Sequence, residues 1–318
     1  MRSMLLLSLF SIAVLINASA WAMDNLLGER ITQLDSQSSL TFVSENRFSW
    51  PTFHTQGMYK VGDKFYVSSV EIIEKTERYP AQEKLQYGEF DRSPGKGKGW
   101  LFEFDLSGTL LRKVQLGEGN MYHPGGIDFD GRYFWIPVAE YRPNSRSLLY
   151  KVDIKSFLPE IITSVPDHIG GLVYRPQTNT LYGMSWGSRD FYAWPLPSIE
   201  NQNLVVSDVA HTNPLFNIDY QDCQYVIENA MLCAGLKKFN TPTGTVSVGG
   251  LSLLSLDDFS IQRHLPISEY IQESGVLSSE LVLTNNAFFA EVAADDKLHL
   301  YFMTETNNQA RLLHYIYN

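Results

Sequence analysis

The sequence predicts an all-β protein, a five-bladed β-propeller that is closed by its N-terminal strand. Three observations predict it: a hairpin pattern recurs five times, further strand-like segments follow the hairpins, and the strand missing from the last repeat is found near the N-terminus. Closure of this kind leaves no long exposed sheet edge. A helical fold is not favoured, because no segment beyond the N-terminal one keeps an apolar period of about 3.6 residues.

The hairpin repeat is clearest in residues 54–71 and 123–140, which align without a gap and place Gly57 on Gly126. Turn residues stand at the centre of each hairpin, and Gly as the first residue of a two-residue loop is typical of a type II′ turn. Three more copies of the hairpin lie at 168–186, 220–237 and 288–305.

The strands that follow the hairpins complete the blades. A third strand is expected after each hairpin, at 99–105, 147–153, 190–196, 250–256 and 310–316. The fifth repeat has no fourth strand before Asn318, and residues 38–45 supply one from the other end of the sequence. We therefore expect a single propeller domain over residues 38–318, preceded by a short segment at 23–37.

Residues 1–22 have the pattern of a secretory signal peptide, with Arg2, a short apolar stretch at 4–16 and small residues before the expected cleavage point. The apolar stretch is too short to span a bilayer, and no later segment is long and apolar enough to do so. We therefore expect a periplasmic or secreted protein without membrane insertion.

The formal net charge of -10 argues against nucleic acid and anionic membranes as partners. With 44% hydrophobic and 13% aromatic residues, the composition is that of a folded protein with a sizeable core. We expect a monomer whose partner is a small polar molecule. The two cysteines, Cys223 and Cys233, leave two alternatives open: they pair in an oxidising compartment, or they remain two buried thiols.

The repeat places chemically active residues at one end of the predicted channel. The first and last residues of a hairpin meet at its open end, so the count predicts that His54 faces Glu71 and that His123 faces Glu140. Because the innermost strands of all blades surround one axis, their open ends form a single ring. The residues expected in this ring are His54, His123, His168, Tyr220, Phe288, Glu71, Glu140, Trp186, Lys237 and Glu305.

Two interpretations of the histidines stay open. In the first, His54, His123 and His168 bind a divalent metal (zinc, manganese or calcium), and Glu71 or Glu140 acts as the general base. In the second, the histidines hold the blades together by bonding to a neighbouring backbone group or carboxylate.

The substrate-binding residues are expected on the rim of the same ring. Aromatic side chains there can stack on a ring, and basic ones can bind a carboxylate or phosphate. The candidates are Trp186, Arg189, Tyr220, Lys237 and Glu305.

Two long insertions, 72–98 and 238–249, leave from the same end of the hairpins. Long loops on a rigid scaffold are common sites of function, and we expect the first to be a lid. Asp128 and Asp130 lie next to a hairpin turn, where aspartate is ordinary turn chemistry.

Four stretches, "FHTQGM", "YHPGGIDFDGRYFWIPVAEYRPNS", "DHIGGLVY" and "GMSWGSRDFYAW", resemble a family of secreted propellers of unknown function. The first stretch and "GWLFEFDLSGTLLRKVQL" are more distantly similar to the glutamine cyclotransferases, which are five-bladed propellers. That second resemblance implies cyclisation chemistry. The chain departs from it at "HPGGID", where Pro124 and Gly125 replace the Glu-Gly of that family.

The favoured hypothesis is a metal-assisted hydrolase or cyclase that acts on a small polar molecule at the channel mouth. The alternative is a propeller without catalytic activity that binds a sugar, peptide or anionic metabolite there. A structural propeller that uses only its outer edges would not need a polar ring.

Overall fold

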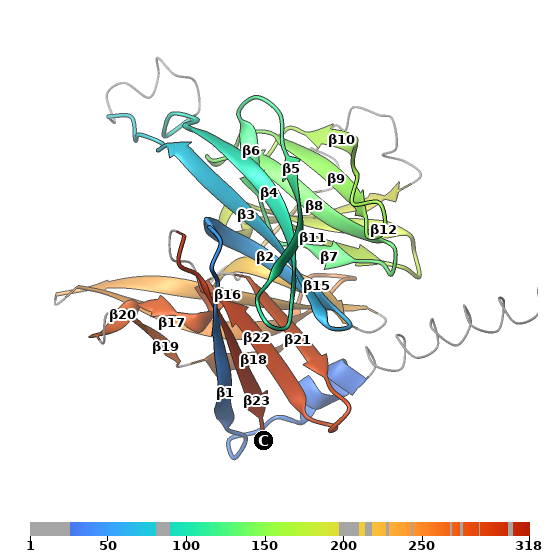
Figure 1. Ribbon diagram of the computed structural model, residues 1–318, viewed down its shortest axis with the longest axis vertical. Coiled ribbons are helices and arrows are strands. Elements are labelled where there is room, and N and C mark those ends of the chain that lie inside the picture. The colour runs from blue at the N-terminus through green and yellow to red at the C-terminus, as the bar shows by residue number, and fades with distance from the viewer. Residues whose placement is uncertain are drawn as a thin grey trace, which may run out of the picture.

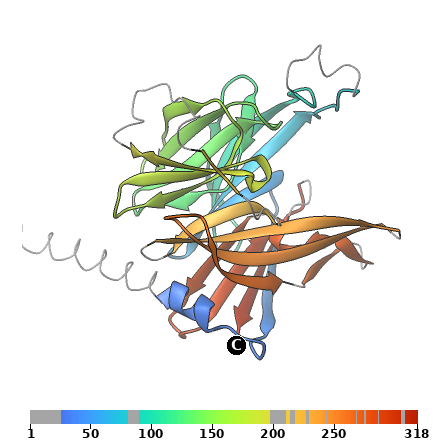
Figure 2. The ribbon, with the colours of Figure 1, turned by 180° about the vertical axis from the view of Figure 1, so that it is seen from behind.

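A computed structural model of the protein describes residues 26–80, 90–196, 210–213, 218–226, 229–242, 244–267, 269–273, 276–285, 287–304 and 308–318. The predicted signal peptide at 1–22 lies outside these residues. Five antiparallel sheets stand round a common axis (Figures 1 and 2), which confirms the five-bladed β-propeller. Among the described residues, no helix has the length and apolar character needed to span a bilayer.

Each blade consists of consecutive strands, the first of which lies next to the axis. The first blade contains β2 (His54–Val61), β3 (Lys64–Glu74), β4 (Lys96–Asp105) and β5 (Leu110–Leu116). The second contains β6 (Met121–Pro124), β7 (Asp128–Phe129), β8 (Tyr133–Glu140), β9 (Ser147–Asp153) and β10 (Pro159–Val165), and both β6 and β7 pair with β8. The third contains β11 (Ile169–Arg175), β12 (Thr180–Ser185), β13 (Asp190–Pro195) and β14 (Ala210–Thr212).

The fourth and fifth blades follow the same plan. The fourth contains β15 (Asp219–Val226), β16 (Ala230–Thr241), β17 (Gly244–Ser255) and β18 (Ile261–Ile267). The fifth contains β21 (Phe288–Val292), β22 (Leu298–Met303), β23 (Arg311–Tyr317) and β1 (Leu40–Arg47). A separate hairpin of β19 (Tyr270–Glu273) and β20 (Val276–Val282) lies between these blades in the sequence.

The N-terminal strand closes the ring as the sequence predicts. β1 pairs with β23 from Leu40 opposite Tyr317 to Arg47 opposite Arg311, and the strand begins and ends two residues later than expected. Residues 26–33 form a helix before it, and Leu27 and Ile31 from this helix are buried in the core of the fourth and fifth blades. The N-terminal segment therefore contributes apolar packing as well as backbone pairing.

Two buried carboxylates on the axis connect all five blades. Asp222 on β15 accepts backbone N–H groups from three other blades: those of Met58 at 2.8 Å, Phe288 at 3.0 Å and Ile127 at 3.2 Å. Asp128 on β7 accepts the N–H groups of Tyr174 at 2.8 Å and Tyr225 at 3.4 Å.

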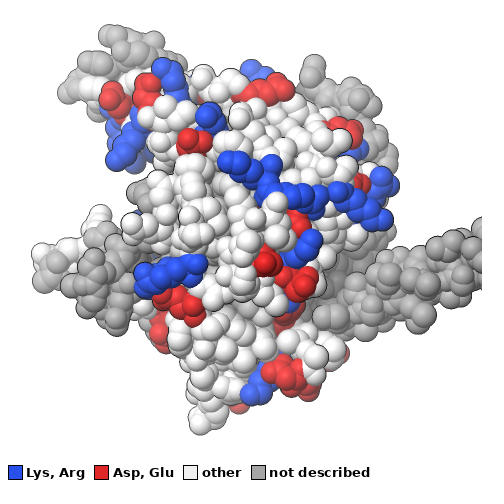
Figure 3. All heavy atoms as spheres, viewed as in Figure 1, with Lys and Arg blue, Asp and Glu red and all other residues white. Residues whose placement is uncertain are grey.

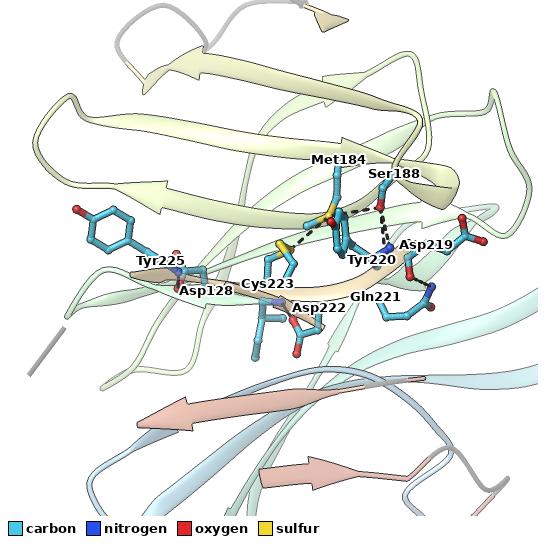
Figure 4. Close-up of a disulfide and its surroundings, with 11 residues drawn as sticks. Asp128, Met184, Ser188, Asp219, Tyr220, Gln221, Asp222, Cys223 and Tyr225 are labelled. Carbon is cyan, nitrogen blue, oxygen red and sulfur yellow. Dashed lines mark hydrogen bonds between the residues drawn. A yellow bond between two sulfur atoms is a disulfide. The ribbon is translucent and has the colours of Figure 1, made fainter. Parts of the chain in front are cut away.

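The interpretation of Asp128 as a turn residue is therefore wrong, because its side chain points to the axis instead of the turn. Asp130 is the residue that caps this turn, through the N–H groups of Arg132 and Tyr133. Figure 4 shows Asp128 and Asp222 beside β15.

The structure resolves the cysteine alternatives in favour of a disulfide. Cys223 and Cys233 are directly opposite each other on β15 and β16, and they are bonded. Both are fully buried, and Figure 4 shows Cys223 next to Met184.

Two histidines and one carboxylate on the fifth blade are linked by side-chain hydrogen bonds. His299 Nε2 donates to Asp295 Oδ1 at 3.0 Å, because a carboxylate can only accept. When neutral, His299 then accepts from His314 Nε2 through its Nδ1, at 2.8 Å. Burial, together with His299 and Lys60, lowers the pKa of His314 to about 4, while Asp295 acts in the opposite direction.

This histidine makes the protein sensitive to acid. The pKa of His314 in the unfolded chain is about 6.5, so the unfolded state binds the proton first as the pH falls. The contribution of His314 to stability is present above about pH 6.5 and is lost progressively as the pH falls toward 4. We expect His314→Gln, whose amide can still donate to His299, to lose less stability over this range in urea unfolding. Parallel pH curves for the two proteins would contradict this.

Candidate functional site

A cavity of about 590 Å³ lies at the open ends of the hairpins, where the inner strands begin. Six of the ten predicted site residues line it. These are His54, His123, His168, Trp186, Tyr220 and Lys237. Of the others, Glu71, Glu140 and Arg189 do not line the cavity, and Glu305 lies outside the described residues.

The predicted pairing of the histidines with glutamates is wrong. His54 lies opposite Val70, and His123 lies opposite Ala139. In the first blade the cause is an extra residue, Gln56, which moves every pair between it and the open end by one position. In the second blade the register shifts between β6 and β7, because Pro124 pairs with Val138 whereas Asp128 pairs with Trp135. A shift of one residue turns a side chain to the other face of the sheet.

The two glutamates therefore make other contacts. Glu71 accepts the indole N–H of Trp100 at 3.0 Å. Glu140 pairs with Arg142, whose Nε lies 2.7 Å from the carboxylate. Neither carboxylate is placed to act on a molecule in the cavity, so their predicted role as general bases has no geometric support.

The same β-bulge recurs in three inner strands, and its extra residue faces the cavity each time. Gln56 on β2, Gly170 on β11 and Gln221 on β15 interrupt the register, and all three line the cavity. Bulges near functional sites commonly redirect side chains in this way. Counting two residues back from each bulge gives His54, His168 and Asp219, so Asp219 and not Tyr220 is the counterpart of the histidines.

His168 has a defined tautomer. Its Nδ1 lies 2.8 Å from the backbone carbonyl of Glu140, which can only accept, so Nδ1 carries the proton and Nε2 carries a lone pair. Burial, together with the nearby Arg92, lowers the pKa of His168 to about 4, while hydrogen bonds to the backbone of Glu140 and Arg142 act in the opposite direction. His168 is therefore a neutral acceptor near pH 7.

His123 is a buried residue of the cavity wall whose ring lacks hydrogen bonds to the described part of the chain. It is 6% exposed, and neither ring nitrogen has a hydrogen-bond partner among the described residues. Burial, together with His168 and His54, lowers the pKa of His123 well below its usual value. A buried polar group without a partner costs about 1–3 kcal/mol, and native structures contain few of them.

The aromatic rings of the wall lie close together. Tyr141 stacks on His123 with ring centres 4.2 Å apart, and Trp186 meets His168 edge to face at 4.6 Å. The ring centres of His54 and His168 lie 6.2 Å and 5.8 Å from that of His123. Within the described part of the chain, no three His, Cys, Asp or Glu side chains are grouped so that they could hold a metal ion. The metal site stays a prediction.

Among the described residues of the cavity wall, basic ones outnumber acidic ones. Arg78, Arg92, Lys237 and Lys238 line the cavity, and Asp219 is the carboxylate in this described part. Burial raises the pKa of Asp219, and Lys237, Arg189 and Lys238 act against this rise. Figure 3 shows acidic and basic side chains interspersed on the face of the molecule that it draws.

The sequence analysis missed both arginines, which come from the 72–98 insertion. Arg92 lies over the ring of Trp186 at 5.1 Å and forms two hydrogen bonds with Asp91, at 2.8 and 2.9 Å. This part of the insertion is therefore a section of the cavity wall. The second insertion, 238–249, is an extension of the β16–β17 hairpin, with pairing that continues to Thr241 and Gly244 (Figures 1 and 2).

Fold and cavity together define a five-bladed propeller with one polar pocket at the channel mouth. The chain belongs to a family of unknown function, DUF6454, whose model matches residues 11–318. This membership confirms the resemblance to an uncharacterised propeller family. None of the curated proteins matches the chain.

Two solved structures share the fold. A hypothetical protein from Leishmania major is 13% identical with a TM-score of 0.54, over 86% of this chain and 90% of that one. The tail fiber of Staphylococcus aureus phage P68 is 10% identical with a TM-score of 0.51, over 91% of this chain and 55% of that one. At identities this low, the similarity supports a shared fold only, and the function has to be argued from the site.

Proposed function

We propose that this protein binds a small, negatively charged organic molecule in the cavity at the channel mouth. The observation that carries the proposal is the group of four basic residues around the cavity of a chain whose net charge is -10. The cavity volume of about 590 Å³ is in the range of small-molecule sites. Trp186 and Tyr141 add an aromatic surface against which a ring can pack.

Binding without catalysis is the function that the geometry supports best. A hydrolase or cyclase would need a general acid or base next to the ligand. Glu71 and Glu140 do not line the cavity, and the pKa of His168, at about 4, makes it a weak base. Asp219, the carboxylate in the described part of the wall, lies near Lys237 and Lys238, which favour its charged form and so oppose a role as general acid. We place the protein in the periplasm or outside the cell, because a structural disulfide is typical of oxidising compartments.

Removal of one basic residue tests the proposal. In calorimetric titrations with small carboxylates and inorganic phosphate, we expect Lys237→Ala to weaken binding of the best ligand about tenfold, the loss of about one charged contact. Binding should also weaken as salt is added, because exposed charges are screened.

Lys297→Ala is the matched control. Lys297 is an exposed lysine in the turn of the fifth blade, and its loss changes the net charge by the same amount. Two results contradict the proposal: no anion of the panel binds, or the control variant weakens binding as much as Lys237→Ala does.

A further inference from the structure

We infer that Gly170 decides which anions the cavity admits, and that the ligand is a carboxylate whose flat aromatic ring occupies the space beside this glycine. The inference rests on the proposed function and adds the uncharged part of the ligand to its charged part. It is carried by a glycine of the cavity wall that neither packing nor backbone conformation requires.

The position of Gly170 in the repeat carries a long side chain in two other blades. Gln56 in "HTQG" and Gln221 in "DYQD" are the bulge residues of β2 and β15, and both line the cavity. Gly170 in "HIGG" is the bulge residue of β11, and it lines the cavity as well. The third blade therefore leaves open the space that a glutamine takes up in the first and fourth blades.

Packing requires a glycine at the matching position of the second blade, but not at Gly170. A Cβ on Gly125 in "HPGG" would lie 2.1 Å from the backbone oxygen of Gly170, so a larger residue does not fit there. Among the described residues, the heavy atoms nearest to a Cβ on Gly170 are the backbone oxygens of Met184 and Ser185, at 3.7 and 3.8 Å. These are ordinary van der Waals distances, so a side chain at Gly170 would meet no obstacle at its first atom.

The backbone of Gly170 does not require a glycine either. Its φ lies outside the left-handed region that favours this residue. A glycine inside a strand weakens the strand, and it commonly marks a place where a ligand or another backbone approaches closely. Since the space at the Cβ of Gly170 is open to the cavity, we assign that space to the ligand.

Aromatic side chains line the wall next to this space. Gly170 lies opposite the end of β12, and Trp186 follows that strand directly. The backbone N–H of Trp186 donates to the carbonyl of His168 at 3.1 Å, which holds Trp186 beside the start of β11. The ring centres of Trp186 and Tyr141 are 5.9 Å apart, and both residues line the cavity. Exposed backbone next to aromatic side chains suits a flat ring better than a branched aliphatic group.

The charge that would bind the carboxylate lies close to the same aromatic wall. The guanidinium of Arg92 is 5.1 Å from the centre of the Trp186 ring. Arg92 uses Nε and Nη2 on Asp91, which leaves Nη1 for a ligand. A carboxylate that Nη1 binds is then about one ring away from Trp186, so the acid of the ligand is attached to the ring directly or through a short link.

Three probes separate the two parts of the ligand. 2-Naphthoate has the ring and the carboxylate, acetate has the carboxylate alone, and 2-naphthol has the ring and is uncharged at neutral pH. We expect titration calorimetry of the mature protein at pH 7 to give at least about tenfold tighter binding of 2-naphthoate than of either other probe.

Two variants of Gly170 test its role. Gly170→Gln gives the third blade the side chain of the first and fourth blades, and it should weaken binding of 2-naphthoate at least about tenfold by occupying the space of the ring. Acetate should bind as before, because the variant changes no charge. Gly170→Ala should keep the thermal midpoint of the parent protein, whereas Gly125→Ala, the matched control, should lower it, because its Cβ meets the backbone of Gly170.

The outcomes distinguish this inference from the proposed function. If 2-naphthoate and acetate bind equally well, the aromatic part of the inference is wrong while anion binding stands. If Gly170→Gln leaves the affinity for 2-naphthoate unchanged, or if Gly170→Ala loses as much stability as Gly125→Ala, the assignment of Gly170 is wrong. If no anion binds at all, the proposed function fails as well. Should Gly170→Gln not fold, the comparison of the three probes on the parent protein still decides the ligand class, and Gly170→Ala still decides whether packing requires the glycine.

Discussion

Asp222→Ala is expected to destabilise the whole propeller by at least about 3 kcal/mol, because it orphans three buried N–H groups that cost about 1 kcal/mol or more each. The three donors, Met58, Ile127 and Phe288, belong to three different blades. The loss should lower the urea midpoint of a single cooperative transition, since the total stability of a domain is about 5–15 kcal/mol.

Two further variants make the result specific. Asp222→Asn keeps the volume, but it turns an NH₂ group toward N–H donors, so we expect it to be nearly as harmful as Asp222→Ala. Asp130→Ala removes a carboxylate from the neighbouring turn, where water can replace it, and should cost only about 1 kcal/mol. Equal stability of Asp222→Ala and Asp130→Ala would show that the axial carboxylate does not hold the blades together.

The glycines of the repeat leave room for the side chain of Asp222. Gly57 and Gly171 follow the bulges of β2 and β11 directly, at the position that Asp222 has in β15. A Cβ on Gly126 would lie 2.7 Å from Asp222 Oδ1, and one on Gly57 would lie 2.6 Å from the backbone of Gly126. Side chains at these glycine positions would therefore take up the space that Asp222 needs at its level of the axis.

The sequence predicts the ring of residues better than it predicts their partners. His54, His123 and His168 recur at the start of a hairpin, and the repeat brings them to one cavity regardless of local detail. The residue that lies opposite each histidine depends on the register of the two strands. A β-bulge shifts this register, and it cannot be recognised from the hydrophobic pattern of the sequence. Glu71 is therefore assigned to the site from the sequence and is bonded to Trp100 in the structure.

Residues outside the repeat could not be found by comparing repeats. Arg78 and Arg92 come from an insertion that no other blade has, so nothing in the pattern places them at the cavity. Asp219 does have a signal. "HTQG", "HIGG" and "DYQD" align once the bulge residue is used as the reference point, and the acid then takes the place of the histidine.

A chain that begins at Phe48 is expected to lose the folded state. It lacks β1, so the backbone groups of β23 from Arg311 to Tyr317 lose their pairing. The truncated chain also lacks the helix at 26–33, which carries the buried Leu27 and Ile31. Burial of each of these side chains stabilises the folded state by about 1.5–3 kcal/mol. Far-ultraviolet circular dichroism during heating should show no cooperative transition.

Moving the strand to the other end of the chain should restore the fold. Ser39 and Asn318 form two backbone hydrogen bonds, Ser39 N to Asn318 O at 3.3 Å and Asn318 N to Ser39 O at 3.1 Å. A two-residue Asn-Gly turn after Asn318, followed by residues 39–47, would therefore make a hairpin with β23. Recovery of a cooperative transition in this permuted chain indicates that the pairing itself closes the propeller. A truncated chain that melts like the parent would mean that β1 is not needed to close the ring. A permuted chain no better folded than the truncated one would mean that the pairing of β1 does not suffice without the helix at 26–33.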